Sequence, residues 1–96
     1  MMKPAQRYEW LEKWLAHGGA HQFADVLDSD LVGAYVAATG ASCTYTMIGA
    51  PRCPQLGRDL ATMHADGLLD RQSVGLPAGD ASMGFPKWVY SYSLKP

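Results

Sequence analysis

The side chains best suited to specific binding lie at helical spacing in the second half of the chain. Gln55, Arg58 and Thr62 share one face of a helix expected over residues 53–66, and Arg52 directly precedes it. Amide, guanidinium and hydroxyl groups form hydrogen bonds with nucleic-acid base edges and phosphates. The opposite face should turn inward, because its residues are sulfur-containing or aliphatic: Cys53, Leu56, Leu60 and Met63.

Four further polar side chains could contact the same partner from flanking segments. Arg71 and Lys87 stand at the base of an expected β-hairpin. Ser42 and Thr44 stand near the start of an expected short helix. Each of the four cations, Arg52, Arg58, Arg71 and Lys87, is on its own equally an ordinary solvated side chain, so it is their joint placement around one helix and one hairpin that favours binding.

Metal binding and catalysis have little support in the sequence. His17, His21 and His64 could combine with the two cysteines, but no short ligand pair is present, and Gly18-Gly19 separates the first two histidines. Cys53 and His64 would lie about 16 Å apart on one helix, too far for a hydrogen bond. No GxSxG or P-loop motif occurs. We therefore expect no metal, no cofactor and no enzymatic activity.

Composition indicates one globular domain spanning residues 1–96. The chain has 96 residues, 48% hydrophobic and 18% charged, with a net charge of −1. Residues 51–96 carry five basic and four acidic side chains, a slight positive excess. No apolar run reaches the roughly 20 residues that span a bilayer, and the N-terminus lacks a signal-peptide core. We expect a cytoplasmic protein with no membrane partner, whose two cysteines are buried thiols, with a disulfide or a metal site as alternatives.

Two helices are expected in the first half of the chain. An amphipathic helix over Pro4–His17, within residues 1–19, ends at Gly18-Gly19. Trp10 and Trp14 lie on its apolar stripe and are either core residues or a dimer contact. Residues 20–28 are ambiguous between a helical turn and an extended piece. Asp28-Ser29-Asp30 then caps a second helix that ends at Thr39-Gly40.

The second half predicts a helix-turn-helix at about residues 44–66, followed by a hairpin. A short helix over 44–49 would bury Met47 and Ile48, and a turn at 50–52 would lead into the helix over 53–66. Residues 68–76 and 87–94 are expected to be strands joined by a loop. The second strand alternates, so its aromatic face must pack on the helices.

The segment 50–71 resembles the winged helix-turn-helix family of bacterial regulators. The resemblance lies in the end of the helix and the start of the wing: Asp66, Gly67, Leu68, Leu69 and Arg71. Gly84 to Tyr92 is similar to the second wing strand of small prophage-encoded winged-helix proteins. The resemblance implies an α+β fold, with three to four helices in residues 4–66 and a two-stranded β-hairpin wing over 68–94.

The resemblance also implies sequence-specific binding to double-stranded DNA by a small phage or prophage-type transcriptional regulator. The N-terminal part of the helix over 53–66 would enter the major groove, with Arg52 and Arg58 on guanine or phosphate, Gln55 on a base and Thr62 on the backbone. By the same resemblance, Arg71 and Lys87 would hold phosphates at the base of the wing, and Ser42 and Thr44 could donate to phosphate near the start of the short helix. Many such regulators are dimers, and Trp10 and Trp14 could form that contact.

Three features depart from the family pattern. Asp59 and Asp66 are expected to repel phosphate at the edge of the contact face, the loop 77–86 has no cation, and the chain is slightly acidic. Three tryptophans and five tyrosines exceed what a small core needs. The alternative is therefore a winged-helix protein-interaction module that uses its aromatic surface and Met83, Gly84 and Phe85 of the loop.

Overall fold

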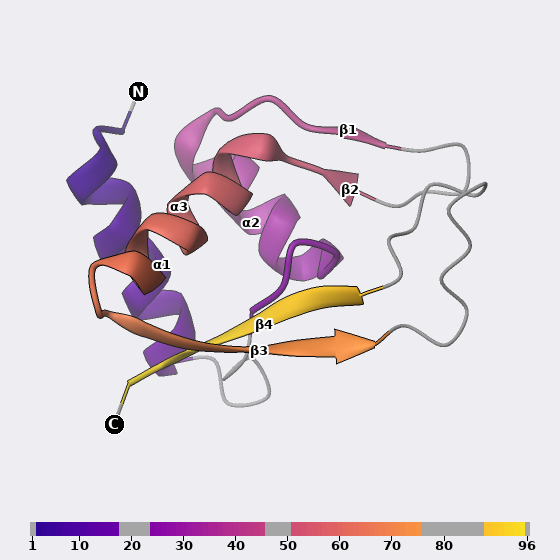
Figure 1. Ribbon diagram of the computed structural model, residues 1–96. Coiled ribbons are helices and arrows are strands. Elements are labelled where there is room, and N and C mark those ends of the chain that lie inside the picture. Colours follow the sequence, from indigo (N-terminus) through magenta and orange to yellow (C-terminus); the bar gives the residue numbers. More distant parts are fainter. Residues whose placement is uncertain (1, 18–23, 46–50, 76–87, 96) are drawn as a thin grey trace.

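The protein is described by a computed structural model that covers residues 2–17, 24–45, 51–75 and 88–95. It is an α+β chain. Within these ranges it contains three helices and two antiparallel strand pairs (Figure 1), in the order α1 Pro4–His17, α2 Ser29–Thr39, β1 Thr44–Tyr45, β2 Pro51–Arg52, α3 Pro54–Ala65, β3 Leu69–Gly75 and β4 Trp88–Leu94. No helix in the described part of the chain is both long and apolar enough to cross a membrane.

The ends of α2 follow the predicted capping chemistry. Asp28 accepts hydrogen bonds on its side chain from the backbone N–H groups of Asp30 and Leu31, at 3.0 and 3.3 Å. Gly40 closes the helix with a left-handed φ of 74°, and its N–H donates to the carbonyl of Val36. The predicted bounds of α1 and the predicted start of α2 are confirmed.

The segment between α2 and α3 differs from the prediction. Thr44 and Tyr45 form strand β1, which pairs with Arg52 and Pro51 of β2. The prediction of a short helix that begins at Thr44 is therefore wrong at those two residues. Residues 46–50, which include Met47 and Ile48, lie outside the described residues. Thr and Tyr favour extended backbone, and six residues are too few for an apolar pattern to separate helix from strand.

The C-terminal hairpin pairs Leu69 with Leu94 at one end and Gly75 with Trp88 at the other. Ala24 forms an isolated bridge to Tyr92 with two backbone hydrogen bonds of 2.8 Å, so β4 lies between β3 and Ala24. This resolves the ambiguous segment at Ala24 in favour of extended backbone. The predicted loop 77–86, and Lys87 after it, lie outside the described residues.

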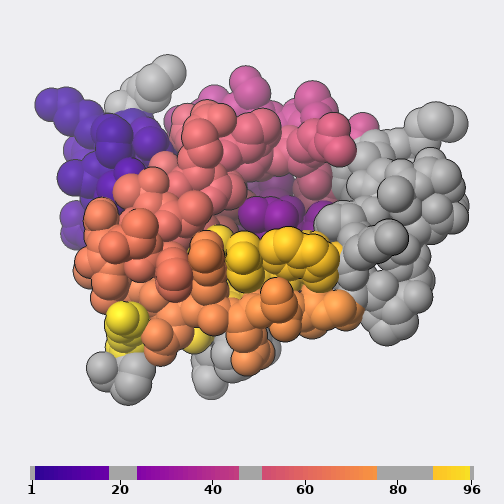
Figure 2. Space-filling model, in the orientation of Figure 1, coloured from indigo at the N-terminus to yellow at the C-terminus, as the bar shows by residue number. Residues whose placement is uncertain are grey.

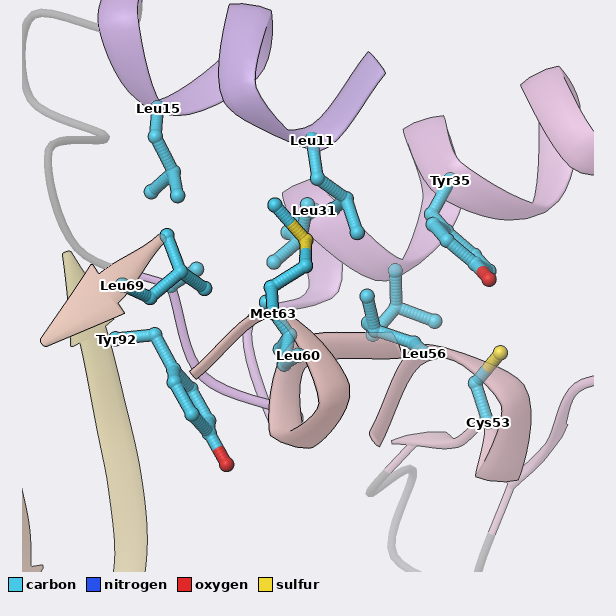
Figure 3. Close-up of a cluster of buried hydrophobic side chains, with 12 residues drawn as sticks. Leu11, Leu15, Leu31, Tyr35, Cys53, Leu56, Leu60, Met63, Leu69 and Tyr92 are labelled. Atoms are coloured by element: carbon cyan, nitrogen blue, oxygen red, sulfur yellow. The ribbon is translucent and has the colours of Figure 1, made fainter. Parts of the chain in front are cut away.

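One apolar cluster joins all three helices to the hairpin (Figure 3). Its most deeply buried side chains include Leu11, Leu31, Tyr35, Leu56, Leu60, Met63 and Leu69. Tyr92 is buried with them, as the predicted packing of the aromatic face requires, whereas Trp88 at the far end of β4 remains 48% exposed. Trp10 and Trp14 stack on each other with ring centroids 5.7 Å apart and pack partly against this core.

Candidate functional site

The outer face of α3 is open to solvent. Arg58 and Thr62 are exposed there, with Ala61 and Ala65 beside them. The inner face is buried, as predicted, because Leu56, Leu60, Met63 and Cys53 belong to the core. Figure 2 shows that α3, β2 and β3 all contribute to one face of the molecule. Two of the predicted binding residues therefore stand on an accessible ridge.

The strand pair β1–β2 places two more candidates together at the start of α3. Arg52 and Thr44 are register partners, and both are exposed. Ser42 is also exposed, just before β1. Arg52 is separated from the first helical residue, Pro54, only by Cys53, which caps α3 without a side-chain hydrogen bond. The strand pair thus brings Thr44 and Arg52 to the N-terminal end of α3.

Asp59 does not lie where the sequence predicts it. We expected it at the edge of the contact face, but it is only 3% exposed and binds Arg7 of α1. Arg7 Nε and Nη2 donate to Asp59 Oδ2 and Oδ1 at 2.8 and 3.1 Å, a bidentate pair. The hydrogen bond to Asp59 raises the pKa of Arg7 above its ordinary value. The negative charge of α3 is therefore turned inward and neutralised by a residue 52 positions away.

Gln55 differs from the prediction, which placed it on the outer face with Arg58 and Thr62: it is part-buried and bonds to the same buried group as Asp59. The Tyr35 hydroxyl donates to Asp59 Oδ2 at 2.5 Å, and Gln55 Nε2 donates to the Tyr35 hydroxyl at 3.0 Å. Burial, followed by the hydrogen bond to Asp59, raises the pKa of Tyr35 well above 10, so Tyr35 keeps its proton. Figure 3 shows Tyr35 reaching from α2 toward the end of α3 that carries Cys53 and Leu56. No sequence pattern signalled these contacts.

On the hairpin, Arg71 is exposed and lies over an aromatic ring. Its guanidinium carbon is 4.1 Å from the centroid of the Tyr90 ring, a cation–π contact that leaves the charge accessible. Trp88 meets the same tyrosine edge-on, with centroids 4.7 Å apart. β3 packs against α3 and follows it through Asp66 and Gly67. Arg71 therefore belongs to an element next to the ridge, while Lys87 lies outside the described residues.

Charge is unevenly distributed along α3. Arg52 and Arg58 are at its N-terminal end, where the first turn contains no acidic residue. Asp66 is exposed at the other end, as predicted. The helix dipole adds a partial positive charge at the N-terminus. The N-terminal half of α3 is thus the part of this surface most suited to an anionic partner.

Comparison of the chain with protein-family models, with curated proteins and with solved structures gives no match.

Proposed function

We propose that this protein binds double-stranded DNA with α3 as its recognition helix, in the manner of a winged helix. The order of elements supports this layout: α1, the extended Ala24, α2, α3 and the β3–β4 hairpin, which would be the wing. In this layout α2 takes the place of the helix that we expected at 44–49. The β1–β2 pair then belongs to a long connection between the two helices.

The observation that carries the proposal is the absence of exposed carboxylate on α3. From Pro54 to Ala65 its one acidic residue is Asp59, which is buried against Arg7. Arg52 and Arg58 are exposed at the end of the helix that would enter the groove. An anionic duplex could therefore approach this end without meeting a carboxylate of the helix.

The remaining candidates fit supporting roles. Thr62 would contact the DNA backbone, as would Thr44 and Ser42 beside the start of α3. Arg71 would hold a phosphate next to the wing, with Lys87 in the same role. A small transcriptional regulator in the cytoplasm of a phage-infected or lysogenic cell fits these roles. A homodimer through Trp10 and Trp14 would double the contacts.

Fluorescence anisotropy with a labelled mixed-sequence duplex tests duplex binding. The logarithm of the binding constant should fall with the logarithm of salt concentration, by about 0.9 per neutralised phosphate. The double variant Arg52→Ala with Arg58→Ala should bind more weakly. It should also reduce the magnitude of this slope by the contribution of about two neutralised phosphates. The matched control, Lys3→Ala with Lys13→Ala, removes one exposed charge just before α1 and one within it, and should bind as the parent does. Absence of binding at low salt, or an equal loss in the control, would contradict the proposal.

Protein binding is the second candidate, and specific side chains favour it. Trp88 is 48% exposed and Tyr45 is 61% exposed, although aromatic residues of this size are usually covered. Replacing Trp88 with Ser separates the two functions. Duplex binding should survive the replacement if α3 carries it, whereas a protein contact through the hairpin should be lost.

A further inference from the structure

A chain of hydrogen bonds runs from α1 through the core to the first turn of α3. Its members are Arg7, Asp59, Tyr35 and Gln55, each in contact with the next. Arg7 can only donate, so both Asp59 oxygens act as acceptors toward it. The Arg7–Asp59 contact therefore fixes which group donates in the Tyr35–Asp59 and Gln55–Tyr35 hydrogen bonds.

The proton of the Tyr35 hydroxyl is committed to Asp59. A hydroxyl has one proton, and the oxygen of Tyr35 is 2.5 Å from an acceptor-only carboxylate. Tyr35 can therefore only accept from Gln55. The amide of Gln55 must present its NH₂ group to Tyr35, as the 3.0 Å contact has it, with Oε1 directed elsewhere. The buried pair thus selects one of the two orientations that an amide can adopt.

The fixed amide keeps one donor and one acceptor available. Nε2 carries two protons, of which Tyr35 takes one, and no residue in the described ranges bonds to Oε1. Gln55 is the second residue of α3, part-buried at the margin of the exposed face. Recognition helices contact base edges with residues near their N-termini.

The available pair matches the major-groove edge of adenine. There Oε1 would accept from N6 and Nε2 would donate to N7. Guanine presents two acceptors, O6 and N7, and offers no donor to Oε1. A free glutamine could turn its NH₂ group toward guanine and donate both of its protons, one to O6 and one to N7, whereas Gln55 has only one of these protons left. An amide anchored by Tyr35 is held to one donor–acceptor order.

Given the proposed duplex binding, on which this step rests, we infer that Gln55 reads adenine at one position of the target, and that Tyr35, held by Asp59 and Arg7, is the positioning residue that orients its amide. A bidentate contact of this kind discriminates by about 5- to 150-fold between bases. Tyr35 touches no base itself, so its loss should change selectivity at that one position and leave the general affinity for duplexes in place.

Selection from a randomised duplex library, read by sequencing, tests this assignment. The parent should yield a motif with an adenine position. Gln55→Ala should lose the preference at that position alone. Tyr35→Phe should admit guanine there and lower the adenine-to-guanine ratio about 5-fold or more. Thr39→Val is the matched control. It removes another buried hydroxyl of α2, which donates to the backbone carbonyl of Tyr35. The substitution leaves the side chains of Arg7, Asp59, Tyr35 and Gln55 in place. Its motif should equal that of the parent.

The outcomes separate the two proposals. If the parent binds no duplex at low salt, both fail. If it binds duplexes without base preference, or if Gln55→Ala selects the parent motif, the assignment of Gln55 fails while duplex binding stands. If Tyr35→Phe selects the parent motif, the positioning role fails. Should Tyr35→Phe not fold, side-chain ¹⁵N relaxation of the parent decides: a Gln55 amide as mobile as that of exposed Gln72 overturns the positioning role, and a rigid one supports it.

Discussion

Removing Arg7 should destabilise the protein far more than removing an exposed charge. Arg7→Met keeps much of the side-chain length but leaves Asp59, with a side chain 4% exposed, without the cation that contacts both its oxygens. Loss of one partner of a buried pair costs about 3–5 kcal/mol, against a total stability of about 5–15 kcal/mol for a domain. Arg7 is itself 15% exposed, so solvent screening places the expected loss near the lower end, at about 3 kcal/mol.

Urea unfolding followed by circular dichroism measures this loss. A loss of about 3 kcal/mol corresponds to a fall in Tm of about 12–24 °C for a domain of this size. The double variant Arg7→Met with Asp59→Asn should recover most of the stability, because the uncompensated charge is gone and the amide oxygen still accepts from Tyr35. Lys13→Met breaks the exposed pair with Glu9, whose side chain is 65% exposed, and should cost less than about 1 kcal/mol. If Arg7→Met costs no more than Lys13→Met, the buried pair does not hold α1 to α3 as described.

Three further predictions concern stability. Above about pH 10 the parent should lose stability as pH rises toward the higher pKa of folded Tyr35, and Tyr35→Phe should remove that part of the dependence in alkaline urea titrations. Gly40→Ala should lower the free energy of unfolding by about 1 kcal/mol, because φ at this position is 74°. Gly33→Ala within α2 should raise it by about 0.5–1 kcal/mol, because the added Cβ meets nothing within 4 Å. Equal effects of the two substitutions in thermal melts would refute the backbone explanation. Met63→Ala should cost about 2–5 kcal/mol in urea, since its side chain is fully buried, and a loss below 1 kcal/mol would place it outside the core.

The helices and the hairpin could be predicted from the sequence because their signals are local. Asp28 and Gly40 mark the ends of α2 through chemistry that acts within four residues. The inward stripe of α3 has a clear helical period. The strand at Thr44–Tyr45 could not be predicted in this way, because a strand of two residues is too short to show the alternation that indicates β4.

The surroundings of the candidate site were less predictable than its position. The exposure of Arg58 and Thr62 followed from the helical period alone. The role of Asp59 did not, because its partner Arg7 lies on another helix and no pattern in the sequence joins them. The hydrogen bond between Gln55 and Tyr35 could not be predicted for the same reason, because Tyr35 lies on α2. Tertiary contacts of this kind decide which polar side chains of a helix remain available to a ligand.

The net charge of −1 is therefore a poor guide to what α3 can bind. Asp59 is neutralised internally by Arg7, so neither charge contributes much to the outer field. Arg58 and Asp66 are eight residues apart, which is about 12 Å along the helix axis. This distance exceeds the electrostatic screening length of about 8 Å at physiological salt. The acidic end of α3 consequently does little to cancel the positive potential that Arg52, Arg58 and the helix dipole create at the other end. Raising the salt concentration should weaken duplex binding through these arginines, and Asp66→Asn should change it by much less than Arg58→Ala.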